Sequence, residues 1–347
     1  MTPETFTHAF YSDNTATVAP ELLASIAAAN AGPQISYGDD PWTGALNDAF
    51  SRFFGAPVQA FVVTTGTAAN ALSLATLSPP YGNVFAHAVS HVVEDECGAV
   101  EFYSGGARLT LVDGDHGRID PQALEHALGA HPPNVHTVQP AALTLTQATE
   151  LGTSYRPEAL AALSAVAHRY GLRVHMDGAR LANALCFLDC EPADVTWRAG
   201  VDVLSFGATK NGALGAEAVV FFDPQLVRDF ELRRKRAGHL LSKSRYPAAQ
   251  LLTYLDGGLW RTHAARANRL ARQIAAAAGP TLLHPVEANE LFLQLGAGGK
   301  RALRGQGFGF YDWGPAAGPE ARFVVSWNQT AESVEALCAA LRAFRSA

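Results

Sequence analysis

Lysine is rare in this sequence, and one lysine stands where a reactive amine would be useful. The four lysines are Lys210, Lys235, Lys243 and Lys300. Lys210 follows the apolar run 201–204, which predicts a buried strand, within the segment 205–212. Arginine stays protonated in proteins, whereas a partly desolvated lysine can become a neutral amine and form a Schiff base with a carbonyl. A lysine after a strand can equally be solvated or contact a phosphate, so Lys210 alone leaves these interpretations open.

Two further features could take part in chemistry. The turn Thr65–Thr67 lies between a short β-branched strand, 60–64, and an alanine-rich helix, 68–77. Such a turn leaves N–H groups unpaired and directs the positive end of the helix dipole outward, which suits a phosphate, although an ordinary strand–helix connection looks the same. Asp177 directly follows the buried-looking run 172–176 and is either a cap or a site carboxylate.

The elements that carry these residues alternate along the chain. The expected strands are 60–64, 83–87, 108–112, 135–146, 172–176, 201–204 and 217–222, and the expected helices include those beginning at Pro20 and those at 44–54, 68–77, 89–98, 121–129, 156–170 and 224–236. This alternation predicts an α/β fold with a mostly parallel central sheet, helices on both faces and ligands beyond the carboxyl ends of the strands. The turn Thr65–Thr67, Asp177 and Lys210 are therefore expected at one edge. A phosphate cradle, a carboxylate and an amine are the parts that hold pyridoxal phosphate.

The pattern changes toward the C-terminus. An amphipathic helix, 259–278, is followed by strands at 291–295 and 322–327 and by a last helix at 331–344. We expect a large domain at 1–252, including the N-terminal segment, and a small α+β domain at 253–347.

Composition excludes several classes of protein. A net charge of -6 and a pI near 6.0 disfavour a nucleic-acid or anionic-membrane binder, although the cluster 233–236 is basic and is expected to meet an anion or a partner subunit. No run approaches the roughly 18 apolar residues of a membrane span, and the start lacks a targeting pattern, so a cytoplasmic protein is expected. The four cysteines are too scattered for a disulfide scaffold, and Cys186 and Cys190 lack zinc-pair spacing, so no metal site is expected.

Motifs along nearly the whole chain resemble one family. They are 12–14, 37–40, 66–70, His91 with 95–98, 147–150, 175–180, 207–212 and Arg322. This set is similar to the low-specificity L-threonine aldolases, which are fold type I pyridoxal phosphate enzymes. The resemblance implies an aspartate-aminotransferase-like large domain, a small C-terminal domain, and active sites completed across the interface of a homodimer or homotetramer, the latter as a dimer of dimers.

The resemblance also assigns roles. Lys210 would hold the cofactor as a Schiff base, Asp177 would pair with the pyridinium nitrogen, and Gly66 and Thr67 would bind the phosphate. His91 would stack on the ring and is the first candidate for the base, with Glu96 as another. The expected substrate-binding residues are Ser12, Arg180, Arg322 and Tyr37, with Arg180 also beside the cofactor. Basic side chains from 233–245 would reach a neighbouring subunit's phosphate.

One segment departs from many members of the family. They carry a second active-site histidine in an Asn-Thr-His-Asn segment, where this chain has Gln147–Glu150.

The function implied is retro-aldol cleavage of L-threonine, L-allo-threonine and related β-hydroxy-α-amino acids to glycine and an aldehyde. The alternatives are an L-phenylserine aldolase, a β-eliminating lyase with the same cofactor, or a nucleotide-binding protein in which Lys210 touches a phosphate.

Overall fold

A computed structural model describes residues 7–314 and 318–346 of the chain. Its centre is a seven-stranded sheet with the strand order β2-β8-β7-β6-β5-β3-β4. The strands are β2 (Gln59–Val63), β3 (Gly82–His87), β4 (Arg108–Val112), β5 (Gln139–Thr146), β6 (Arg173–Gly178), β7 (Val203–Gly207) and β8 (Glu217–Phe221). Only β8 opposes the other six, because it pairs antiparallel with both of its neighbours. The expected mostly parallel sheet is confirmed.

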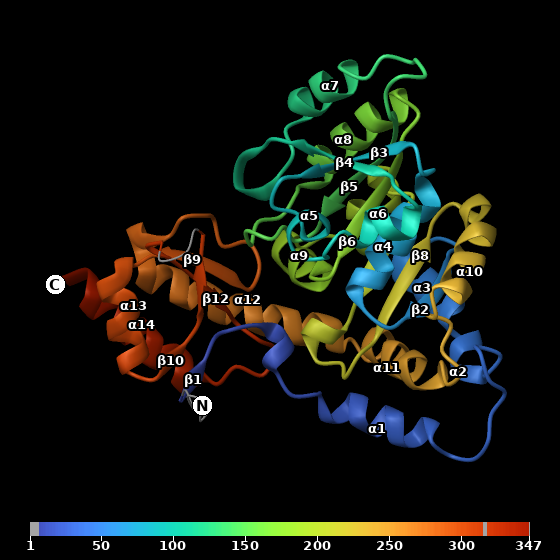
Figure 1. Ribbon diagram of the computed structural model, residues 1–347. Coiled ribbons are helices and arrows are strands. Elements are labelled where there is room, and N and C mark those ends of the chain that lie inside the picture. The colour runs from blue at the N-terminus through green and yellow to red at the C-terminus, as the bar shows by residue number, and fades with distance from the viewer. Residues whose placement is uncertain (1–6, 315–317, 347) are drawn as a thin grey trace.

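Helices cover both faces of this sheet (Figure 1). One face packs on α3 (Leu46–Phe54), α8 (Pro157–Arg169), α9 (Leu181–Leu188) and α11 (Arg245–Asp256), and the other packs on α4 (Gly66–Leu77), α6 (Ala99–Ser104) and α10 (Val227–Arg236). Neighbouring residues of a strand pack on opposite faces of the sheet. In β7, Val203 packs on the second face and Leu204 on the first, and in β8, Val219 packs on the second face and Val220 on the first. This alternation explains why the strands have continuous apolar sequences.

A second core lies in the C-terminal part of the chain. Its sheet has the order β11-β12-β9, formed by β9 (Glu290–Gln294), β11 (Tyr311–Trp313) and β12 (Glu320–Val324). The helices α12 (Leu259–Ala278), α13 (Gly296–Gly305) and α14 (Ala331–Ser346) accompany it.

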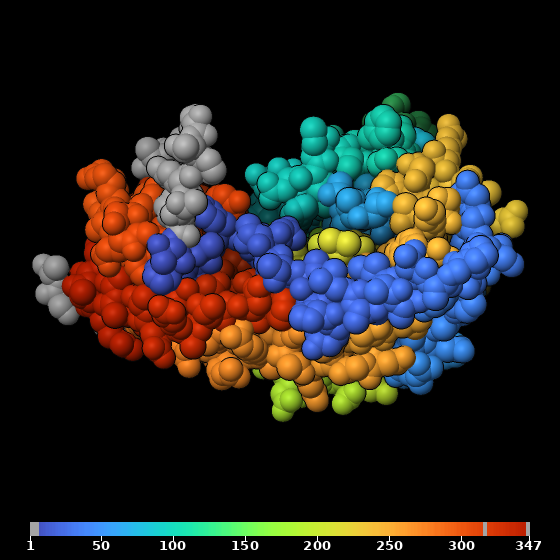
Figure 2. All heavy atoms as spheres, turned by 90° about the horizontal axis from the view of Figure 1, so that it is seen from below, coloured from blue at the N-terminus to red at the C-terminus, as the bar shows by residue number. Residues whose placement is uncertain are grey.

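The N-terminal segment crosses to this second core. The strand β1 (His8–Ala9) pairs in parallel with β10 (Phe308–Gly309), and Phe10 is buried in the second core. Figure 2 shows the blue N-terminal part of the chain passing from the red C-terminal part along the face that carries α1 (Pro20–Ala29). The expected domain boundary at 252/253 falls inside α11, so the division into two domains stays a prediction.

Two expected elements differ in the structure. Of the helix expected at 89–98, the α-helical part is α5 (His91–Glu94). Cys97 and Gly98 have positive φ angles of 51° and 71° and separate it from α6, which begins at Ala99. The strand expected from residue 135 begins at Gln139, and Val135 is exposed. None of the helices in the described part of the chain combines the length and apolar character that a membrane crossing requires.

Candidate active site

Lys210 is carried by a well-anchored turn. It lies in a 3-10 turn, Thr209–Asn211, directly after β7. The side-chain Nδ2 of Asn211 donates to the hydroxyl of Tyr254 (2.7 Å) and to the backbone oxygen of Trp260 (2.9 Å). The backbone that presents the lysine amine is therefore fixed by residues of α11 and α12.

Asp177 lies at the carboxyl end of β6 and is buried. Its Oδ1 accepts from the N–H of Ala179 (2.9 Å) and its Oδ2 from Nδ2 of Asn70 (2.7 Å). Burial alone would raise the pKa of Asp177, but the nearby His91 and Lys210, together with these hydrogen bonds, hold it below its ordinary value. The carboxyl is therefore ionised at neutral pH.

His91 and Asp177 are linked through a buried polar network. Nδ2 of Asn70 also donates to Oε1 of Glu96 (2.8 Å), and the same oxygen lies 2.8 Å from Nδ1 of His91. The hydrogen bond to Glu96 raises the pKa of His91, although burial opposes this. Since Nδ1 is engaged, Nε2 is the His91 nitrogen left to exchange a proton.

Glu150 supports the backbone of His91. Its Oε1 accepts from the backbone N–H of His91 (2.7 Å) and from the hydroxyl of Thr146 (2.9 Å). Burial, and then the negative charge of Asp177, raise the pKa of Glu150 to about 7. The segment that lacks the second histidine thus brings a titratable acid beside His91.

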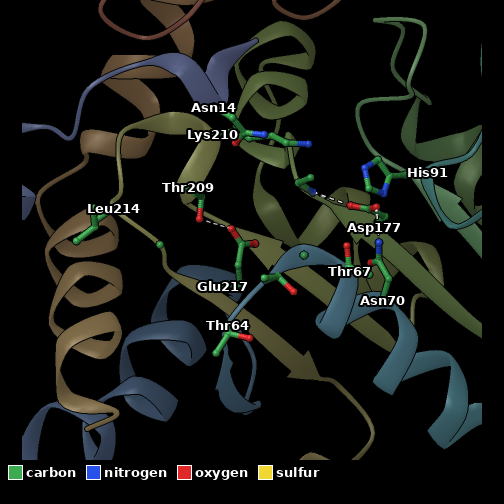
Figure 3. A pocket seen from close by; sticks show the side chains of 14 residues that line it. Asn14, Thr64, Thr67, Asn70, His91, Asp177, Thr209, Lys210, Leu214 and Glu217 are labelled. Carbon is green, nitrogen blue, oxygen red and sulfur yellow. Dashed lines mark hydrogen bonds between the residues drawn. The ribbon is translucent and has the colours of Figure 1, made fainter. Parts of the chain in front are cut away.

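The first turn of α4 faces the same space. Thr65 caps this helix, with its hydroxyl accepting from the N–H of Ala68 (3.1 Å), and Gly66 and Thr67 occupy its first turn. N–H groups in a first turn have no partner within the helix, which suits an anion. Figure 3 shows Thr67 and Asn70 on one side of the cavity, and Thr209 and Glu217 on the other.

Glu217 reaches this edge because β8 runs opposite to its neighbours. It is the first residue of β8 and pairs with Val63 of β2 and Gly207 of β7, which are the last residues of their strands. Its carboxyl accepts a hydrogen bond from the hydroxyl of Thr209. Burial raises the pKa of Glu217 to about 7, while Thr209 and Lys210 oppose the shift.

The expected arginines lie together at the other end of the site. Arg180 forms a bidentate pair with buried Asp13, from Nε (2.7 Å) and Nη2 (3.0 Å), and its Nη1 lies 3.1 Å from Oε2 of Glu290. Arg322 donates to Oε1 of Glu290 from Nε (3.1 Å) and Nη2 (2.6 Å). Both guanidinium groups therefore contact carboxylates of the protein itself.

Two adjoining cavities collect nearly all of the expected residues. The first has a volume of about 430 Å³, and the expected residues that line it are Gly66, Thr67, His91, Asp177 and Lys210. The second has a volume of about 280 Å³ and is lined by Ser12, His91, Arg180, Lys210 and Arg322. Arg180 lines the second cavity and not the first.

Tyr37 lines neither of these cavities. It is half exposed, and its ring lies 4.5 Å from Nζ of Lys235.

Comparisons with known proteins identify the family of this chain. The model of the beta-eliminating lyase family matches residues 9–297. Over 340 residues, 97% of either chain, the sequence is 43% identical to the low specificity L-threonine aldolase of Pseudomonas aeruginosa. The chain belongs to the low-specificity L-threonine aldolase family. The family expected from the sequence is thus confirmed.

Solved structures of fold type I proteins share the fold of this family member. A threonine aldolase from Leishmania major superposes with a TM-score of 0.90 at 24% identity, over 97% of this chain and 99% of that chain. A lysine-to-alanine variant of a serine palmitoyltransferase from S. paucimobilis, solved with a bound PLP–myriocin aldimine, has a TM-score of 0.72 at 18% identity, over 97% and 87% of the two chains. These likenesses confirm the fold class expected from the sequence.

No role was assigned from the sequence to several residues of this aldolase-family site. They are Asp13, Asn70, Glu150, Glu217 and Glu290. Asn70 lies inside a helix, and Glu217 and Glu290 begin apolar strands. Asp13, Asn70 and Glu150 lie in the motifs 12–14, 66–70 and 147–150 that carry the family resemblance. Glu217 and Glu290 offered only their position at the start of an apolar strand, where a carboxylate has to be exposed, paired or protonated.

Proposed function

We propose that the protein cleaves L-threonine, L-allo-threonine and related β-hydroxy-α-amino acids to glycine and an aldehyde, with pyridoxal 5'-phosphate as its cofactor. One observation carries the proposal: Lys210, Asp177 and the first turn of α4 line a single cavity. They do so in a chain that is 43% identical to a low specificity L-threonine aldolase. This makes the protein a carbon–carbon lyase.

The groups in the first cavity fit the cofactor by their chemistry. Lys210 would bind its aldehyde, Asp177 would keep its ring nitrogen protonated, and the N–H groups of Gly66 and Thr67 would hold its phosphate. When bound, pyridoxal phosphate supplies an electron sink for the charge left on the substrate's α-carbon. The low pKa of Asp177 supports its role, since only the ionised carboxylate stabilises a pyridinium.

The second cavity would bind the substrate's carboxylate. Arg322 is the better placed of the two arginines, because Arg180 is buried and held on two sides by carboxylates, whereas Arg322 is 19% exposed. Ser12 lines the same cavity. Anchoring the carboxylate there would orient the Cα–Cβ bond relative to Lys210, which lines both cavities.

His91 would take the proton of the β-hydroxyl at Nε2. It lines both cavities, so it adjoins the cofactor and the substrate. Glu96 holds Nδ1 and would stabilise the imidazolium that forms. Glu96 is buried and shared with Asn70, which favours this supporting role over that of the base itself.

We also propose a cytoplasmic homotetramer. Leu214, which lines the first cavity and is 63% exposed, also lines a groove together with Leu23 and Ile26, and this apolar surface beside the site would be covered by a neighbouring subunit. Since Tyr37 lies outside both cavities of its own chain, its expected role would be in a neighbour's site. All four cysteines are free, which suits a reducing compartment.

Replacement of Lys210 tests the proposal. In wild-type protein, borohydride should fix added pyridoxal phosphate covalently, and L-threonine should yield glycine and acetaldehyde in equal amounts. Lys210→Ala should lose both properties, whereas Lys300→Arg, at a lysine that pairs with Asp312 and lies outside the two cavities and the segment 233–245, should retain covalent fixation. Undiminished aldehyde release by Lys210→Ala would contradict the assignment.

The same samples distinguish β-elimination, the reaction named by the matching family model. Elimination would release ammonia and a keto acid in place of glycine and acetaldehyde.

A further inference from the structure

The carboxylate of Glu290 lies between Arg180 and Arg322, the two arginines of the second cavity. Its side chain is fully buried at the start of β9, Oε1 accepts two hydrogen bonds from Arg322, and Oε2 lies 3.1 Å from Nη1 of Arg180. It also lines the second cavity, together with both arginines. A protein carboxylate thus already holds the position where two guanidinium groups converge.

The charges in this cluster balance. Asp13 takes the Nε–Nη2 edge of Arg180, and Glu290 takes the Nε–Nη2 edge of Arg322. Two positive groups are matched by two negative groups, so the pair of arginines offers no excess positive charge to an incoming carboxylate. A ligand has to bind Arg322 at its remaining N–H groups, beside the carboxylate of Glu290.

We propose that Glu290 is a specificity-determining residue, an internal carboxylate that competes with the substrate for Arg322 and Arg180. It weakens the binding of every carboxylate and disfavours substrates with a second acid group. The inference rests on the proposed function, in which the substrate's carboxylate enters the second cavity. At an effective dielectric constant of about 20, two like charges roughly 6 Å apart repel strongly enough to change a dissociation constant by more than about tenfold.

Removing the charge of Glu290 should increase the stabilisation that the protein gains from binding a carboxylate ligand. In Glu290→Gln the ion pairs of Glu290 with the buried Arg180 and the partly buried Arg322 are lost and the pair of Arg180 with Asp13 remains, which leaves one positive charge of this cluster uncompensated. A bound carboxylate would restore the balance. Ligand should therefore raise the melting temperature of this variant more than that of wild type.

The experiment uses acetate as a probe that carries only the carboxylate. Full-length wild type, Glu290→Gln and a matched control are titrated at constant ionic strength, with and without added pyridoxal phosphate, by calorimetry and thermal melting. The control is Glu287→Gln, because Glu287 also lies between two arginines, Arg118 and Arg156, each 3.5 Å away, but lines neither cavity.

The expected result is at least about tenfold tighter acetate binding by Glu290→Gln than by wild type or Glu287→Gln. In the loaded enzyme, KM for L-threonine should fall, and the rate on L-threo-3-hydroxyaspartate should rise relative to that on L-threonine. Equal or weaker acetate binding by Glu290→Gln would overturn the proposal, because Glu290 would then only hold the arginines in place.

A second variant keeps the test decisive if Glu290→Gln does not fold. Glu290→Asp retains the charge but withdraws it by one methylene, so acetate affinity should again increase, and an unchanged or weaker affinity overturns the proposal. Acetate binding is independent of the cleavage reaction. Wild type that binds acetate as expected but releases no glycine would contradict the proposed function and not the competition by Glu290.

Discussion

Asn70 gives a direct test of how the polar groups of the site support one another. Its buried Nδ2 donates to both Glu96 (2.8 Å) and Asp177 (2.7 Å), so Asn70→Ala removes two hydrogen bonds to carboxylates at once. A hydrogen bond to a charged group contributes about 1.5–3 kcal/mol. The free energy of unfolding is therefore expected to fall by about 3–5 kcal/mol.

Cofactor affinity should fall with it. The hydrogen bond from Asn70 is one of the interactions that keep the pKa of Asp177 low, so its loss disfavours the ionised carboxylate that would pair with the ring nitrogen. Each 1.4 kcal/mol lost from that pairing weakens cofactor binding about tenfold. Asn70→Asp should be worse, since it adds a third carboxylate between Glu96 and Asp177.

Urea unfolding and titration with pyridoxal phosphate measure the two effects. Ser73→Ala is the matched control, since Ser73 is buried one turn further along α4 and its hydroxyl has no hydrogen-bond partner among the described residues. It should alter neither quantity by more than about 0.5 kcal/mol. If Asn70→Ala resembled Ser73→Ala in both measurements, the bridging role of Asn70 would be refuted.

Two further predictions concern the edge of the sheet. The pKa of Glu217 is raised to about 7 from an ordinary value of 4.5, so the folded state binds this proton more tightly than the unfolded state does. The contribution of Glu217 to stability is therefore present below pH 4.5 and is lost as the pH rises to about 7. In Glu217→Gln the unfolding free energy should decline less steeply over this range, by up to about 1.4 kcal/mol per pH unit. An unchanged slope between pH 5 and 7 would count against the raised pKa of Glu217. For Gly178→Ala, the new Cβ would lie 2.7 Å from Cδ1 of Leu204 and 2.8 Å from the backbone oxygen of Ser205, so we expect a loss of about 2 kcal/mol or more in urea unfolding. Gly129→Ala, which meets nothing within 4 Å, should cause no loss, and equal behaviour of the two variants would show that the backbone yields at Gly178.

The residues that would hold the cofactor could be predicted from the sequence for a topological reason. The turn at Thr65–Thr67, Asp177 and Lys210 each follow an apolar run, and parallel strands bring their carboxyl ends to one edge. The residues that hydrogen-bond these groups and shift their pKa values could not be predicted in this way. Asn70 sits within an alanine-rich helix, and only the three-dimensional packing of α4 against β6 shows that its amide bridges two carboxylates.

The elements that were predicted incorrectly or missed have local causes. The pattern at 89–98 contains helix-forming residues, but α5 ends at Glu94, and the left-handed backbone angles of Cys97 and Gly98 separate it from α6. Apolar Val135 suggested an early strand start, yet it lies in an exposed loop and the first ladder partner is Gln139. The helix α13 was missed because it begins with Gly296 and contains Gly298 and Gly299, residues that disfavour helix.

The two ends of the chain build the second cavity together, and this sets an order of maturation. Asp13 accepts a hydrogen bond from Asn289, 276 residues away, whereas the parallel ladder from β3 to β7 uses the continuous stretch 82–207. Contacts between distant segments form late, because the chain entropy of closing the loop opposes them. During synthesis the sheet that carries Asp177 can assemble while β9 and β12 are still being made. We therefore expect a nascent chain to form the residues that would hold the cofactor first, and the second cavity, which would bind the substrate's carboxylate, last.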